Sequence, residues 1–189
     1  MENWRKKREV THHYDKFAEV YDTQYADEQK AKIEATLENV FLKTNNFVLD
    51  VGCGTGLLFP YIANRVHFLI GIDISQKLLK KARTHKKHYP NTHILLADAD
   101  HLPFPNQTFH TTFAITLLQN IPNPSTTLQE IRRVGKEHST IAVTGLKKEF
   151  TKKTFTTALE KAKLEISILK TDDDLKDYIA TCHLKTEIK

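Results

Sequence analysis

The sequence of 189 residues contains only two cysteines, Cys53 and Cys182, and this scarcity excludes a disulfide-stapled secreted scaffold. No apolar run reaches the roughly eighteen residues that a membrane-spanning helix needs. The basic first eight residues have no apolar stretch behind them, so they do not form a secretory signal. Repeats and low-complexity segments are also absent. These absences predict free thiols in a reducing compartment, and we expect a cytoplasmic protein without a membrane span.

With 40% hydrophobic residues, the chain can bury the full core of one compact domain. Its net charge of +5 is concentrated in two places. Residues 76–88 carry several basic side chains and no acid, and residues 5–8 form a second basic cluster beside Trp4. Such clusters can bind a phosphate backbone, although most of them are solvated helix faces. RNA therefore stays open as a less favoured partner.

Strands and helices are predicted to alternate along the chain. Apolar runs predict strands over residues 47–51, 67–72, 93–97, 109–116, 140–145, 164–169 and 178–184. Apolar residues at helical spacing predict helices over residues 11–22, 26–43, 57–64, 76–88, 125–134 and 154–162. The central alternation indicates a parallel sheet with helices on both faces.

The segment over residues 48–58 is the most informative motif. An apolar strand ends in glycines at alternate positions, Gly52, Gly54 and Gly56, and an apolar helical pattern follows. Glycines in such a turn let the main chain come very close to a ligand. The spacing G-x-G-x-G differs from the dinucleotide pattern G-x-G-x-x-G. Asp50 lies in the first predicted strand, and Asp73 directly follows the second. An ordinary strand–turn–helix with incidental carboxylates is the simpler alternative.

These segments resemble the class I S-adenosylmethionine-dependent methyltransferases. The resemblance implies a single-domain, Rossmann-like, doubly wound α/β fold, whose seven-strand sheet is mostly parallel with an antiparallel last strand and has helices on both faces. It implies S-adenosylmethionine as cofactor and S-adenosylhomocysteine as product, without a metal. Asp50 would hold the ammonium of the methionine end, directly or through water, and turn N–H groups would receive its carboxylate. Asp73 would accept hydrogen bonds from both ribose hydroxyls.

The segment over residues 96–104 resembles the D-A-x-x-L-P-F motif of small-molecule methyltransferases related to quinone-biosynthesis enzymes. The resemblance implies that Asp98 accepts a hydrogen bond from the adenine amino group and that the Ala99 N–H donates to a ring nitrogen. A solvated acidic turn is the alternative. We also assign Ile74, Thr116 and Leu117 to the cofactor site.

Residues 14–22 are similar to the Y-D-x-x-A-x-x-Y-D lid segment of the same family. The similarity implies that Tyr14 and Tyr21 cover the cofactor and help to close the substrate side. The alternative is an amphipathic helix whose aromatic side chains only pack on the sheet. We therefore divide the chain into an N-terminal helical lid, residues 1–43, and a cofactor-binding core, residues 44–189, with no connection long enough for an inserted substrate domain.

Three departures from the family pattern make the substrate uncertain. His110 stands where the family usually has an aspartate, Gln119-Asn120 replaces histidines of many members, and residues 135–138 replace a Pro-Gly-Gly turn. No catalytic residue is assigned. The polar groups expected near the methyl end are Tyr14, Tyr21, His12, His13, Gln119 and Asn120. Adjacent helical residues diverge by about 100°, so the pair His12-His13 is not expected to bind a metal.

The predicted function is methyl transfer to an unidentified acceptor, and the compact core favours a small molecule. One alternative is an RNA or protein methyltransferase that acts with a partner subunit. Another is a non-catalytic subunit that only binds the cofactor. A nicotinamide oxidoreductase is disfavoured by the glycine spacing and by the Asp98-Ala99 pair.

Overall fold

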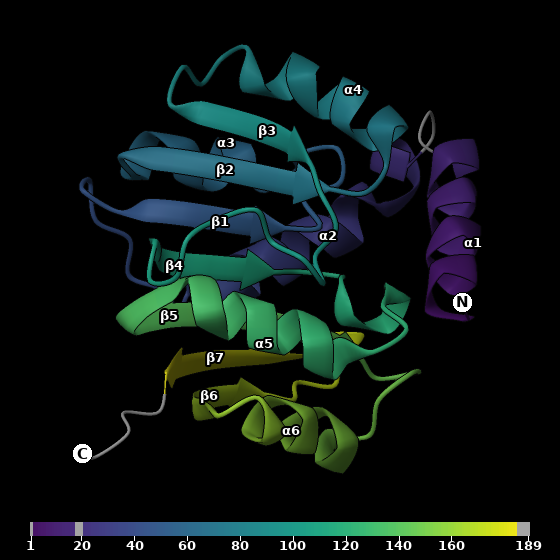
Figure 1. Ribbon diagram of the computed structural model, residues 1–189, viewed down its shortest axis with the longest axis vertical. Coiled ribbons are helices and arrows are strands. Elements are labelled where there is room, and N and C mark those ends of the chain that lie inside the picture. Colours follow the sequence, from purple (N-terminus) through teal and green to yellow (C-terminus); the bar gives the residue numbers. More distant parts are fainter. Residues whose placement is uncertain (1, 18–20, 185–189) are drawn as a thin grey trace.

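Figure 1 shows a computed structural model that describes the main chain of residues 2–17 and 21–184 and the side chains of residues 4–16 and 27–184. A seven-stranded sheet has the order β3-β2-β1-β4-β5-β7-β6. Its strands are β1 (Phe47–Val51), β2 (Phe68–Asp73), β3 (Thr92–Leu96), β4 (Phe109–Ala114), β5 (Gly135–Leu146), β6 (Leu164–Lys170) and β7 (Asp177–Leu184). Strand β7 runs antiparallel to both of its neighbours, β5 and β6, and the pairings among β1 to β5 are parallel. The predicted Rossmann-like fold class is confirmed.

Helices cover both faces of this sheet. Their bounds are α1 (Glu2–Phe17), α2 (Tyr21–Leu37), α3 (Phe59–Ile62), α4 (Gln76–Lys86), α5 (Pro124–Val134) and α6 (Lys152–Lys161), with short 3-10 turns η1 (Ala63–Arg65) and η2 (Leu118–Asn120). One hydrophobic cluster contains apolar residues of α5 and α6, and a second contains those of α2, α3 and α4. In Figure 1 α5 and α6 lie in front of the strands, and α2 and α3 lie behind them.

The central strand β1 shows why the sheet is doubly covered. Val48 belongs to the α2–α4 cluster and Leu49 to the α5–α6 cluster, because successive side chains of a strand point to opposite faces. Both are fully buried. A continuous apolar strand is typical of a parallel sheet with helices on each side.

The N-terminal helices differ from the predicted ranges. Helix α1 includes the basic segment before residue 11, and α2 ends at Leu37 instead of residue 43. The early start of α1 has a tertiary reason, since Lys7 lies against Asp98 and Asp100 on the core. Phe41, which lies within the predicted helix of residues 26–43, is 87% exposed beyond the end of α2. Residues 18–20, predicted to be helical, lie outside the described residues.

Strand β5 begins at Gly135 instead of the predicted residue 140, so residues 135–138, which replace the family's Pro-Gly-Gly turn, belong to the strand. Gly135 pairs with Phe109, and the register shifts before Thr111 pairs with Thr140. His138 lies within the strand at a φ of +59°. An irregular strand with extra residues therefore takes the place of the turn.

Both cysteines are buried with free thiols, Cys53 in the α2–α4 cluster and Cys182 in the α5–α6 cluster. The described helices include none that is both long and apolar enough to traverse a lipid bilayer.

Candidate cofactor and acceptor site

The candidate site lies where the carboxyl ends of β1 to β4 meet. The chain reverses its direction of sheet growth between β1 and β4, and ligands of open α/β sheets bind at such a switch point. An open cavity of about 1040 Å³, mouth included, occupies this edge. In Figure 1 helix α1 lies opposite the arrowheads of β1 to β4, and Lys7, Val10, Thr11 and Tyr14 of this helix line the cavity.

Most of the residues assigned to the cofactor from the sequence meet in this one cavity. Its wall includes Tyr14, Asp50, Gly52, Gly54, Asp73, Ile74, Asp98, Ala99, Thr116 and Leu117. Gly56 does not line the cavity. Tyr21 begins α2, and its side chain lies outside the described residues.

Two glycines of the turn after β1 have different reasons to be glycine. Both have a positive φ, +55° at Gly54 and +83° at Gly56. A Cβ on Gly54 would meet no heavy atom within 4 Å, so its main chain faces open space in the cavity wall. A Cβ on Gly56 would lie 2.5 Å from the ring of Phe59. Packing therefore explains Gly56, whereas close approach of a ligand would explain Gly54.

Asp50 is a buried carboxylate that lacks a donor. Its side chain lies in the cavity wall and the residue is 3% exposed. None of the described residues donates a hydrogen bond to it. Burial raises the pKa of Asp50 to about 8, and the nearby Asp73 carboxylate adds to this shift. A cationic ligand group beside Asp50 would favour the ionised form, and the ammonium of a methionine moiety is such a group.

Asp73, at the end of β2, joins two turns. Its Oδ2 accepts from the Gly54 N–H at 2.9 Å and its Oδ1 accepts from the Ser75 N–H at 2.8 Å. Burial raises the pKa of Asp73, and these main-chain hydrogen bonds oppose the shift. A carboxylate accepts about four hydrogen bonds, so two ribose hydroxyls can still be accommodated.

Asp98 contacts a lysine that the sequence analysis did not single out. Lys7 Nζ lies 2.7 Å from both oxygens of Asp98 and 2.5 Å from Asp100 Oδ2. Burial lowers the pKa of Lys7, but the hydrogen bonds to Asp100 and Asp98 outweigh this effect, and the net pKa is raised. The carboxylate predicted to bind adenine is thus also the residue that holds α1 against the core.

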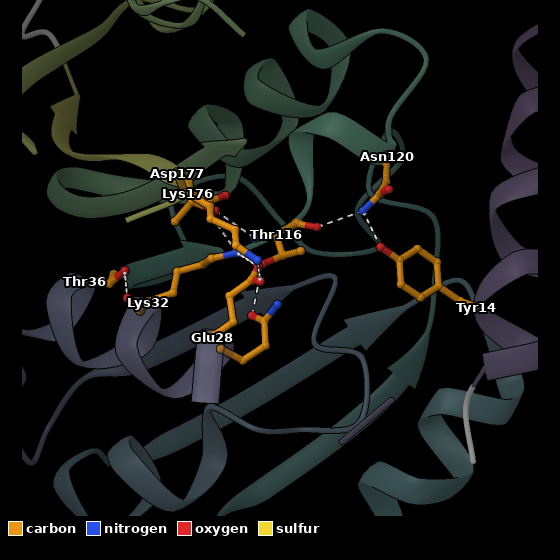
Figure 2. Close-up of polar contacts among 10 residues, drawn as sticks. Tyr14, Glu28, Lys32, Thr36, Thr116, Asn120, Lys176 and Asp177 are labelled. Carbon is orange, nitrogen blue, oxygen red and sulfur yellow. Dashed lines mark hydrogen bonds and ion pairs between the residues drawn. The ribbon is translucent and has the colours of Figure 1, made fainter. Parts of the chain in front are cut away.

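Tyr14, Thr116 and Asn120 meet in a second polar part of the cavity wall, as Figure 2 shows, and Gln29 adjoins them. We call this part the candidate acceptor side. Asn120 Nδ2 donates to the Tyr14 hydroxyl at 2.8 Å and to the Thr116 carbonyl at 2.9 Å. Thr116, just after β4, donates its hydroxyl hydrogen to Gln29 Oε1 at 3.1 Å. Gln29 lines the cavity and lies on α2, where no local pattern in the sequence marks it.

Gln119, His12 and His13, also expected near the methyl end, are not in the cavity wall. Gln119 has a buried side-chain oxygen without a hydrogen bond. His12 lines a separate shallow groove along α1, and His13 is exposed. Within the described ranges, no three His, Cys, Asp or Glu side chains lie close enough together to hold a metal ion.

The sheet order, the glycine turn and the carboxylates at the ends of β1, β2 and β3 define the fold class of the class I S-adenosylmethionine-dependent methyltransferases. A family model described as a methyltransferase domain matches residues 49–143, about half of the chain. The chain belongs to this family of S-adenosylmethionine-dependent methyltransferases, and S-adenosylmethionine is the cofactor of the family.

Individual relatives agree with the family. The chain is 33% identical to an uncharacterized protein of Methanocaldococcus jannaschii, over 70% of this chain and 50% of the relative. It is 31% identical to a malonyl-[acyl-carrier protein] O-methyltransferase of a Marinomonas species, over 69% of this chain and 48% of the relative. The chain thus spans about half the length of these curated relatives.

A solved structure shows the same fold over nearly the whole chain. It is a methyltransferase from Haloferax volcanii in complex with the Trm112 methyltransferase activator. The TM-score is 0.81 at 16% identity, and the match covers 92% of this chain and 98% of that one. At this identity the likeness concerns the fold alone.

Proposed function

We propose that this chain transfers the methyl group of S-adenosylmethionine to a small-molecule acceptor. The observation that carries the proposal is the single cavity at the β1–β4 switch point. It combines Asp50 and Asp73 on the cofactor side with Gln29, Thr116 and Asn120 on the other side. Groups suited to a cofactor and groups suited to a small acceptor therefore line one continuous cavity.

Cofactor binding is assigned to the residues at the strand ends. Asp50 would pair with the ammonium, Gly52 and Gly54 would let the methionine end approach the main chain, and Asp73 would accept the ribose hydroxyls. The adenine edge would meet Asp98 and the Ala99 N–H, between the apolar side chains of Ile74 and Leu117. Gly56 and Tyr21 remain predictions without support from the cavity wall.

Residues 1–43 would form the lid over the core of residues 44–189. Helix α1 supports this division, since it contributes Lys7, Val10, Thr11 and Tyr14 to the cavity wall. S-adenosylmethionine supplies an electrophilic methyl group when it is bound. The protein would accelerate transfer mainly by excluding water and aligning the acceptor, and a base is needed only if the acceptor arrives protonated.

The test is incubation with methyl-labelled cofactor and a fractionated cell extract. We expect label in the small-molecule fraction, and we expect Tyr14→Phe to lower the rate, because it removes the hydroxyl that accepts from Asn120. A triple charge reversal of the exposed Lys77 and Lys80 on α4 and Lys87 just after it should have no effect. Label in RNA that is lost on this reversal and at high salt would contradict the proposal.

A methyltransferase that needs a protein partner is the second candidate. Strand β3 is an edge strand of the sheet, and it exposes Leu95 and Leu96 by 41% and 56%. Such an apolar edge is suited to pairing with a strand of another protein. This candidate predicts an inactive isolated chain whose activity returns with a partner fraction of the extract, and Leu96→Glu should prevent that return.

A further inference from the structure

A buried lysine lies behind the acceptor side of the cavity. Lys32 on α2 is 2% exposed, and its Nζ lies 2.8 Å from Asp177 Oδ2 and 3.0 Å from Thr116 Oγ1 (Figure 2). Glu28 lies 3.7 Å from Lys32 and 2.6 Å from Lys176. Among the described residues, two cations therefore face two carboxylates.

The direction of each hydrogen bond in this cluster follows from the chemistry of its donors. An ammonium group only donates, so Thr116 Oγ1 accepts from Lys32 and must give its own hydrogen to Gln29 Oε1. The Gln29 amide is thereby oriented with its oxygen toward Thr116. Its Nε2 keeps two N–H groups that donate to none of the described residues, and Gln29 lines the cavity.

Asn120 is oriented by the same threonine. Its Nδ2 uses both hydrogens, one on Tyr14 and one on the Thr116 carbonyl, so its Oδ1 is left as an acceptor in the cavity wall. Thr116 itself has a φ of +58° and donates its N–H to Thr144 Oγ1 at 2.8 Å. A β-branched residue in the left-handed region is strained, and these bonds hold it there.

From this arrangement we infer an oxygen-anion subsite, formed by Gln29 Nε2 and backed by Lys32 through Thr116, that selects phenols or carboxylic acids as methyl acceptors. The inference rests on the proposed methyl transfer. A chain of hydrogen bonds that starts at a cation polarises its last donor, so Gln29 Nε2 favours an electron-rich oxygen. At Gln29, an acceptor with a cationic amine would meet N–H groups of like polarity. Lys32 is a positioning residue here, since Thr116 and Gln29 separate it from the acceptor.

The subsite fits the chemistry of the transfer. A lone pair of the anionic oxygen forms the new C–O bond while the C–S bond breaks, and the electron pair of that bond stays on sulfur. A phenol loses its proton to solvent when it binds as the anion. In the transfer itself, anion and sulfonium become a neutral ether or ester and a neutral thioether, so charge is balanced and no further proton moves. A base is then unnecessary, and within the described residues no histidine lines the cavity.

The test uses 4-nitrocatechol, whose absorbance reports its ionisation, added to the complex of the protein with S-adenosylhomocysteine. We expect bound 4-nitrocatechol to ionise at lower pH than free 4-nitrocatechol, and benzoate to compete better than benzylamine. Gln29→Glu removes the donors at nearly constant size and should weaken binding about ten- to hundredfold. Affinity for S-adenosylhomocysteine, measured alongside, shows that the fold is intact, and Gln29→Leu replaces this variant if that affinity is lost.

The role of Lys32 needs a variant that leaves no buried charge unpaired. The double variant Lys32→Met, Asp177→Asn removes both charges of the ion pair. It should raise the pH at which bound 4-nitrocatechol ionises. If Lys32 had only a structural role, that pH would not change. Lys30→Met is the matched control, because Lys30 is exposed on the same helix, and it should change nothing.

Unchanged binding in Gln29→Glu or Gln29→Leu, or stronger competition by benzylamine, would overturn the subsite. If label still enters small molecules in that case, methyl transfer stands and only the subsite falls. Absence of label from every small-molecule fraction would instead remove the proposed function.

Discussion

The raised pKa of Asp50 makes cofactor binding depend on pH in a way that tests the cofactor site. With a pKa of about 8, roughly nine of ten Asp50 side chains are protonated at about pH 7. If the ammonium of the ligand pairs with the carboxylate, binding must release this proton. We therefore expect about 0.9 proton to be released for each S-adenosylhomocysteine bound near neutral pH. The dissociation constant should fall about tenfold for each unit by which the pH rises, up to about pH 8.

Titration calorimetry in two buffers with different ionisation enthalpies measures the proton count directly. Asp50→Asn cannot ionise, and both the proton release and the pH dependence should be strongly reduced, with weaker binding. Any release that remains in this variant belongs to Asp73, whose pKa burial also raises. Binding without proton release and with a flat pH dependence in the natural protein would refute the assignment of Asp50 to the ammonium.

The same shift affects the stability of the ligand-free protein, with a definite sign. The pKa of Asp50 in the folded state, about 8, lies above its ordinary value of 3.8, so folding favours the protonated form. The protonated Asp50 contributes fully to the free energy of unfolding below about pH 4. This contribution, on the order of 5 kcal/mol, is lost as the pH rises through about 8. Urea denaturation of Asp50→Asn should lack this loss, and S-adenosylhomocysteine should counteract it in the natural protein.

Two further predictions concern the glycine turn and α1. Gly56→Ala should lower the free energy of unfolding by about 2 kcal/mol or more, because the new methyl group clashes with the Phe59 ring. Gly54→Ala should lower it by about 1 kcal/mol and should mainly weaken S-adenosylhomocysteine binding. Similar losses of binding in both variants would contradict this assignment. Lys7→Met leaves two neighbouring carboxylates without a cation and should lower the free energy of unfolding, measured in urea, by about 3 kcal/mol. Lys6→Met, at an exposed position, should leave it unchanged. Equal effects of the two variants would refute the ion pair.

The sequence by itself determined the sheet and the carboxylates on the proposed cofactor side of the cavity. Asp50, Asp73 and Asp98 lie in or directly after apolar strands, and parallel strands bring their carboxyl ends to one edge. Local patterns therefore fix which side chains meet there. The glycine turn is equally local, since a positive φ at Gly54 needs no knowledge of distant residues.

Only the tertiary structure decided the acceptor side and the contacts of α1. Lys7 and Lys32 contact residues 91 and 84 positions away in the chain, Asp98 and Thr116. A lysine on a polar helix has the same local sequence whether it is solvated or buried in an ion pair. Gln29 is oriented by the hydroxyl of Thr116, just after β4, and the position of this hydroxyl relative to Gln29 depends on packing between α2 and the sheet. The carboxylates of the cofactor side follow from strand periodicity, whereas the charges of the acceptor side follow from which distant partners are available to neutralise them.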